Sequence, residues 1–184
     1  MKWRSVGLKA IYLAPVLTTG GMNEAELELV GKTLQGSAGF TGDSPTRTDF
    51  FSNESMAPEE SVVSENPVKA LAYNLMDLDP DKVIVVAGGE AVQMTASKKY
   101  KAARSAVELE HCARVITDFG IVIDFPRLKT VANVNWPLSR TEIATVAVEH
   151  SVMEPYGVSD APYEYYQGSE LTAGQAGYEL FSHP

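Results

Sequence analysis

The stretch GSAGFTGDSPTRTDFFSNESMAPEESVVSENP, residues 36–67, interrupts an otherwise strand-like chain and decides how the rest of the fold is interpreted. Connections in compact domains are commonly about 4 to 6 residues long, and those beyond about 12 to 15 residues are usually functional or disordered. Disorder is disfavoured because the stretch contains large apolar residues that gain free energy from burial: Phe40, Phe50, Phe51, Met56, Val62 and Val63. We therefore predict a long, ordered loop that contacts another subunit.

The chain before this loop predicts two strands. Residues 6–17 are rich in apolar and β-branched residues and end in the turn sequence TTGG. Residues 24–30 alternate between acidic and apolar side chains, which favours a half-buried strand over a helix. The opening residues have the positive charge of a signal peptide, but Lys9 interrupts the apolar run, so we expect a strand there. No apolar stretch approaches the ~20 residues that span a bilayer, and we expect a soluble protein without membrane contact.

The chain after the loop predicts one strand at residues 68–78 and, further on, a run of four strands joined by short polar, glycine or proline breaks: residues 105–117, 121–125, 127–135 and 142–153. Strands with such tight connections are typical of an antiparallel sheet that closes into a sandwich or barrel. We expect a mainly β fold of this class, with residues 1–155 as one domain. Residues 156–184 are rich in tyrosine, glycine and acids, and we expect an extended C-terminal arm whose Tyr163, Tyr165 and Tyr166 could contact a neighbour or remain exposed.

One short helix is predicted at residues 80–87. Asp79 is a good N-cap, Pro80 suits the first helical position, Asp81 complements the helix dipole, and Gly88 can end the helix in a left-handed conformation. The β-branched run VIVV at residues 83–86 favours the alternative, a buried strand.

The charges divide the chain into regions of opposite sign. The net charge is −9, from 15 basic and 24 acidic residues, so general electrostatic attraction to nucleic acid or anionic lipid is not expected. Residues 43–65 hold six acids against the single Arg47, and no Lys or Arg follows Arg140. The one basic cluster comprises Lys98, Lys99, Lys101 and Arg104. These regions are either ordinary solvated faces, or the basic cluster of one subunit meets the acidic loop of its neighbour.

Signatures of catalysis and of cofactor binding are weak. The single Cys112 excludes an intramolecular disulfide and a multi-cysteine metal site. His111 and Cys112 are neighbours in a predicted strand, so their side chains point to opposite faces and cannot easily form a base and nucleophile pair, although His150 could approach in space. The Asp77, Asp79 and Asp81 spacing opens a calcium-loop pattern whose glycine and glutamate positions are not matched, so capping explains it better. We therefore predict no catalytic residues, no metal and no cofactor.

The order of these elements resembles the tail tube proteins of bacteriophages, over residues 6–155. The resemblance is carried by the sequence GKTLQGSAGFTGDSPTRTDFFSNES, by the following strand and short helix with its Gly-Gly, and by the block of strands that ends near residue 153. Its most characteristic letters are FTGD at 40–43, Pro45-Thr46 and TDF at 48–50. The long C-terminal segment departs from the shorter versions of that family.

The resemblance implies a β-sandwich with one helix that assembles as hexameric rings, stacked into the conduit through which the viral genome leaves the capsid. The long loop would reach the adjacent ring. The residues expected to carry this inter-ring contact are Phe40, Asp43, Arg47, Asp49, Phe50 and Phe51, with the aromatic pair 50–51 as buried anchors and the charges setting register. The implied partners are copies of the same chain and the tape-measure, tail-terminator and baseplate or distal tail proteins. The implied location is the virion tail, made in the bacterial host cytoplasm.

An acidic conduit wall would let DNA pass without specific binding, because a basic wall would hold it through counterion release. Strand alternation gives Glu108, Glu110 and Asp124 as candidate lumen residues, although they could equally face outer solvent. Two other classes of function stay open. One is the inner tube of a contractile injection system or a capsid decoration protein, and the other, suggested only by Cys112, His111 and His150, is an enzyme or small-ligand β-barrel.

Overall fold

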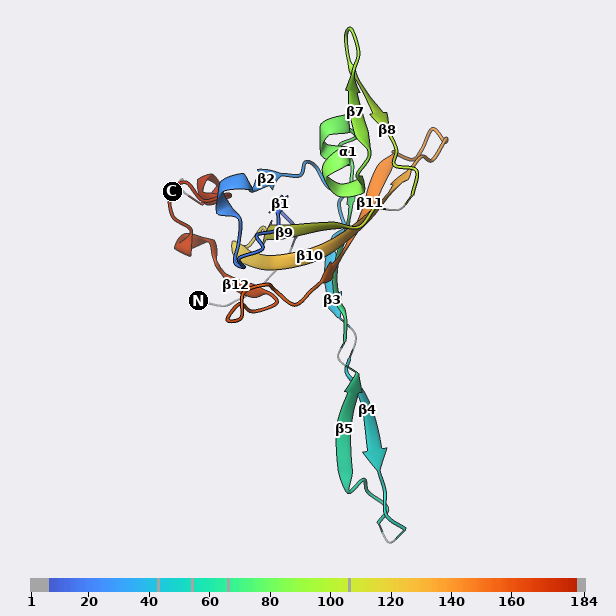
Figure 1. Ribbon diagram of the computed structural model, residues 1–184, viewed down its shortest axis with the longest axis vertical. Coiled ribbons are helices and arrows are strands. Elements are labelled where there is room, and N and C mark those ends of the chain that lie inside the picture. Colours follow the sequence, from blue (N-terminus) through green and yellow to red (C-terminus); the bar gives the residue numbers. More distant parts are fainter. Residues whose placement is uncertain (1–6, 43, 54, 66, 106, 182–184) are drawn as a thin grey trace.

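The computed structural model describes residues 7–42, 44–53, 55–65, 67–105 and 107–181. The fold class is the predicted one: a mainly β, sandwich- or barrel-like fold with antiparallel sheets and a single α-helix. Two hairpins project from the body toward opposite ends of the longest axis (Figure 1). No helix in the described part of the chain is long and apolar enough to cross a membrane.

The main sheet has eight strands, all paired antiparallel. Seven of them follow the order β2-β1-β9-β10-β11-β6-β3, and β12 pairs with β10 outside this path. Their bounds are β1 Ala10–Pro15, β2 Glu28–Leu29, β3 Gly39–Gly42, β6 Lys69–Leu75, β9 Leu109–Ile116, β10 Ile121–Asn135, β11 Thr145–Val152 and β12 Glu164–Gln167.

The long strand β10 corrects the prediction of two separate strands divided at Pro126. Residues 121–124 pair with β12, and residues 128–135 pair with β11, with an irregular register between Phe125 and Leu128. Proline has no N–H for the ladder, but a register irregularity is a place where a strand tolerates it. One strand therefore continues through Pro126 and joins two halves of the sheet.

The helix α1, Pro80–Ala87, confirms its prediction, and the alternative of a buried strand is wrong. The Asp79 carboxylate accepts a hydrogen bond from the Asp81 backbone N–H at 3.1 Å, and Gly88 ends the helix with a φ of 68°. The β-branched residues do not prevent the helix, because Val83 and Val86, three positions apart, both become buried.

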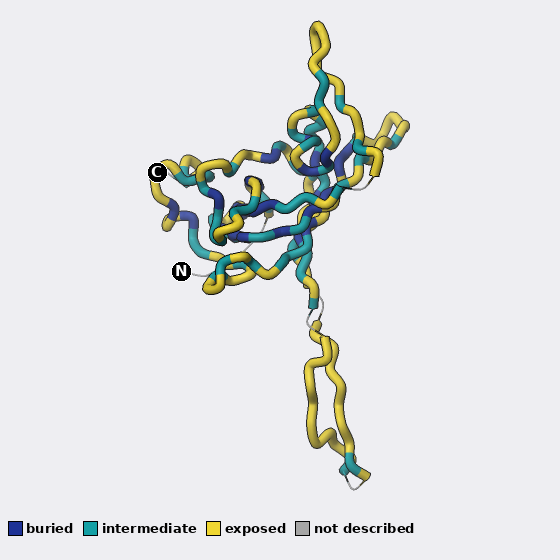
Figure 2. The backbone as a smooth tube through the Cα atoms, in the orientation of Figure 1, coloured by how far each residue is buried: buried dark blue, intermediate teal, exposed yellow. Residues whose placement is uncertain are grey.

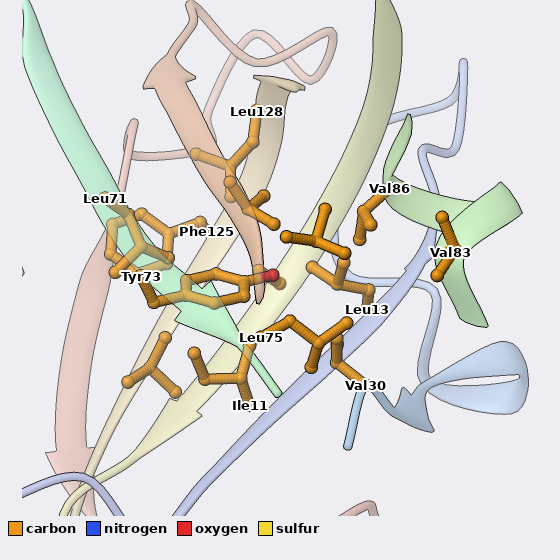
Figure 3. Packing of buried hydrophobic residues seen from close by; sticks show 14 residues of the cluster. Ile11, Leu13, Val30, Leu71, Tyr73, Leu75, Val83, Val86, Phe125 and Leu128 are labelled. Carbon is orange, nitrogen blue, oxygen red and sulfur yellow. The ribbon is translucent and has the colours of Figure 1, made fainter. Parts of the chain in front are cut away.

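The main core lies between α1 and the inward face of the sheet, as the dark segments of Figure 2 indicate. Figure 3 shows its side chains converging from several strands and from the helix. The largest fully buried members include Tyr73, Phe125 and Ile11. In β6 the buried residues alternate with more exposed ones, as the period-two pattern of that strand predicts.

Two parts of the body differ from the predicted strands. Residues 24–30 form a 3-10 turn, η1 Glu24–Glu26, followed by the two-residue strand β2, because acidic side chains of this stretch bond to Asn23 and Arg114. A hairpin that we did not predict, β7 Glu90–Gln93 with β8 Lys98–Lys101, follows α1. Its charged second strand lacks the apolar alternation by which strands are recognised.

The prediction of an extended C-terminal arm outside the core is wrong. Strand β12 pairs with β10, and two short 3-10 turns follow, η2 Gly168–Glu170 and η3 Tyr178–Leu180. Leu171 is buried in a second apolar cluster on the other face of the sheet, where aromatic side chains cover it: Tyr12, Tyr166, Tyr178 and Phe181. The aromatic residues of the C-terminal segment thus pack against this face of the sheet.

Candidate functional site

The long segment after β3 forms a projecting hairpin, which we call the arm (residues 44–65). Its strands β4 Thr46–Phe50 and β5 Glu60–Glu65 pair only with each other. Every residue of both strands is exposed, and Figure 2 shows the arm extending away from the body, exposed along its strands and intermediate in parts of its tip. An isolated two-stranded hairpin is at best marginally stable in water, so packing against another surface would stabilise the arm.

Large apolar side chains lie on both faces of the arm. Directly paired residues share a face, so Thr48 and Val62 lie on one face and Arg47 and Val63 on the other. Exposure is 54% for Phe50, 61% for Phe51, 45% for Val62 and 48% for Val63. Large apolar side chains exposed on both faces of a projecting hairpin are characteristic of an interaction site.

The tip of the arm is closed by its own hydrogen bonds. The Glu59 backbone N–H donates to the Phe50 carbonyl at 2.9 Å, and the Ser52 hydroxyl donates to the Glu59 carboxylate at 2.6 Å. The Ser55 hydroxyl donates to the Ala57 carbonyl at 2.8 Å. These bonds fix the turn that presents the two phenylalanines, so the apolar surface is partly organised before any partner binds.

The structure divides the predicted inter-ring residues. Arg47, Asp49, Phe50 and Phe51 belong to the arm, and Asp43 lies outside the described residues. The predicted inter-ring role of Phe40 is wrong, because its ring packs in this chain's own core. The centroid of the Phe40 ring lies 5.1 Å from that of Phe125 and 5.2 Å from that of Tyr163. Strand β3 pairs with β6 and turns this side chain inward, so Phe40 is not available to anchor a neighbour.

The predicted basic cluster is partly neutralised within the chain. Lys98 pairs with Asp81, and Lys101 pairs with Glu90 at 3.3 Å. Lys99 and Arg104 are exposed and form no ion pair with the described residues. Two of the four cations therefore remain free to meet an acidic partner.

The assignment of Asp124 to a lumen is wrong, because this carboxylate is 2% exposed. Arg114, itself 1% exposed, donates to both of its oxygens at 2.8 and 2.7 Å, and Tyr166 adds a hydrogen bond at 2.8 Å. Arg114 also binds the Glu24 carboxylate, with Nη1 to Oε2 at 2.8 Å. This cluster joins η1, β9, β10 and β12, which strand alternation alone could not reveal.

Glu108 and Glu110, the other candidate lumen acids, are each paired with a cation. Glu108 lies 2.6 Å from Lys129 and its side chain is 62% exposed. Glu110 accepts from Arg127 at 2.7 Å and from Tyr156 at 3.0 Å, and the Arg127 hydrogen bond lowers the pKa of its carboxyl group. The negative charge of both acids is thus largely balanced within the chain.

The residues that suggested an enzyme form a buried structural network. His111 Nδ1 lies 2.8 Å from the Thr130 hydroxyl, which lies 2.7 Å from His150 Nδ1, and His150 Nε2 lies 3.1 Å from the Tyr73 hydroxyl. Cys112 is fully buried beside the Pro15 carbonyl, and burial raises the pKa of its thiol. This is the environment of a packed thiol, not of an activated nucleophile.

The buried His150 predicts a loss of stability in acid. Burial and the nearby His111 lower the pKa of His150 to about 3. In the unfolded chain the His150 imidazole binds a proton near pH 6.5. The free energy of unfolding is therefore highest above that pH and falls as the pH drops toward 3. Between pH 6.5 and 5 we expect a loss of about 2 kcal/mol from this residue.

Urea unfolding of the wild type and of His150→Asn at intervals of pH tests this prediction. The wild type should lose stability between pH 6.5 and 5, and the variant, although less stable at pH 7, should show a clearly flatter dependence over that interval. Equal slopes for the two proteins would show that His150 does not control the acid response.

A second exposed apolar surface escaped the sequence analysis. The turn between β10 and β11 carries Trp136 at 60% exposure, Leu138 at 98% and Ile143 at 51%. This WPLS sequence predicted only a break between strands, although large apolar residues in a turn are themselves a signal of contact.

No family model matches the chain, and no curated protein matches it.

Proposed function

We propose that this chain is a structural subunit of a bacteriophage tail tube, which assembles as stacked hexameric rings and forms the conduit for genome delivery. The observation that carries the proposal is the arm, whose two described strands pair with each other, are exposed along their whole length and carry apolar side chains on both faces. The letters on which the resemblance to tail tube proteins mainly rests run from residue 40 to residue 50, into the first strand of the arm.

The physical role proposed for the arm is head-to-tail contact. An element that projects from one end of a subunit and fits a different surface on its neighbour makes a heterologous contact, which generates rings or open stacks. Phe50 and Phe51 are the anchors that lose water on contact, and Asp49 and Arg47 set the register. A body held by an extensive antiparallel sheet keeps its shape while the arms join successive rings.

The partners proposed for the chain follow from this role. Copies of itself form the tube in the virion tail, and tape-measure, terminator and baseplate or distal tail proteins meet its inside and its ends. DNA passes through without specific binding, in agreement with the net charge of −9.

Negative-stain electron microscopy of the purified protein, over a range of concentrations, tests the proposal. We expect rings or tubes of uniform diameter, with sedimentation showing species far heavier than one 19.9 kDa chain. A protein that stays monomeric at every concentration and salt condition would contradict it. The control is the same protein carrying the arm substitutions described in the Discussion.

A further inference from the structure

We infer that the arm of one copy binds a distinct surface at the far end of a second copy, which we call the distal patch: Trp136, Leu138, Arg140 and Ile143 of the β10–β11 turn, with Lys99 of the β7–β8 hairpin. This inference rests on the proposed function of the arm, and it names the surface that receives it. The partner is therefore a second copy of this chain.

The first argument is the apolar character of the patch. Trp136, Leu138 and Ile143 are 60%, 98% and 51% exposed, so about half or more of each residue faces water. The turn is held by the Ser139 hydroxyl, which accepts from the Thr141 backbone N–H at 3.3 Å. Tryptophan is among the residues most enriched at the energetic centre of interfaces, and an aromatic pair such as Phe50-Phe51 suits it as a partner.

The second argument is position. The arm leaves the body at one end of the longest axis, whereas the β7–β8 hairpin and the β10–β11 turn lie toward the opposite end (Figure 1). The pairing of β3 with β6 directs the arm away from this patch in the single chain (Figure 1). Copies that follow one another along this axis would bring the arm of one to the patch of the next, which is the geometry that stacking requires.

The third argument is charge. Asp49, Glu60 and Glu65 on the arm form no ion pair with the described residues, and Arg47 is the only cation there. In the distal patch, Lys99 and Arg140 likewise have no ion-pair partner among the described residues, and the β10–β11 turn also holds one acid, Glu142. The two surfaces therefore present opposite charge around apolar centres, an arrangement that favours this pairing over arm-to-arm contact.

Site-directed cross-linking between two proteins that each carry one introduced cysteine tests the inference. One protein carries Ser61→Cys on the arm and the other carries Asn135→Cys beside the distal patch, and neither position is a proposed anchor. The native Cys112 is buried, and the wild-type protein measures its background reaction. After mixing and treatment with a short bismaleimide, we expect a covalent heterodimer as the main product.

The matched control pairs Ser61→Cys with Val158→Cys, a fully exposed position on the C-terminal segment. We expect at least tenfold less heterodimer from this pair than from the pair with Asn135→Cys. If tubes form but both pairs react equally, or the control reacts more, the receiving surface is wrong while the proposed function stands. If the chain shows no self-association by microscopy, both the inference and the proposed function are contradicted.

Discussion

Replacing Phe50 and Phe51 together by serine is expected to abolish assembly while leaving the body folded. Both side chains are more than half exposed in the single subunit, and neither supports the main core. In an assembled contact, each buried aromatic anchor typically contributes about 2 kcal/mol or more. Losing both should lower the association constant of each contact about a thousandfold, which sedimentation velocity and negative-stain microscopy would detect.

Phe119→Ser is the matched control for this change. Phe119 is 66% exposed in the turn between β9 and β10, so its replacement removes one phenylalanine of comparable exposure from another part of the surface. We expect this variant to assemble as the wild type does, and both variants to keep the wild-type thermal midpoint to within a few degrees. Tubes formed by the arm variant would show that the arm is not the contact element.

Replacing Arg114 by methionine is expected to cost about 3–5 kcal/mol of the free energy of unfolding. The change keeps the aliphatic part of the side chain but leaves the Asp124 carboxylate buried, with Tyr166 as its remaining hydrogen-bond donor among the contacts described. Since domains are typically stable by only about 5–15 kcal/mol, urea unfolding should show a large shift of the midpoint.

Two further variants show whether the buried charge is the cause. Arg127→Met breaks the ion pair with Glu110, whose side chain is 32% exposed, and should cost at most about 1 kcal/mol. Adding Asp124→Leu to Arg114→Met removes the stranded carboxylate and should recover much of the loss. A small effect of Arg114→Met, similar to that of Arg127→Met, would mean that the cluster does not hold β12 and η1 on the sheet.

Local chemistry made much of the fold predictable. The cap, proline and glycine around residues 79–88 specify α1 against the β preference of its valines, because each acts through the backbone of its own turn. The alternation in β6 indicates its buried face for the same reason. The antiparallel class follows from strands joined by short breaks.

Features that depend on distant partners were not predictable. Pro126 signals a break, yet β10 continues because the irregularity near it separates two pairing partners. Strand alternation predicts that the Asp124 side chain is exposed, and only the fold shows Arg114 and Tyr166 hydrogen-bonded to it. The C-terminal tyrosines have the composition of a loose arm, but the sheet supplies the surface that they cover.

The candidate site was predictable as a segment but not in its shape. Length and apolar content predict that residues 36–67 are a contact element, whereas the pairing of part of this segment into a two-stranded arm depends on register. The same uncertainty misplaced Phe40, which belongs to β3 and to the core. The distal patch could not be predicted from strand alternation, since most of its residues lie in a turn.

Hydrogen exchange of the arm, measured in assembled and unassembled protein, tests the central claim most directly. Both strands of the arm are exposed in the single subunit, and a hairpin without other partners opens readily. We predict that peptides covering β4 and β5 exchange rapidly in the unassembled protein and become strongly protected on assembly. Rapid exchange of these peptides in the assembled state, equal to that in the single subunit, would contradict the account.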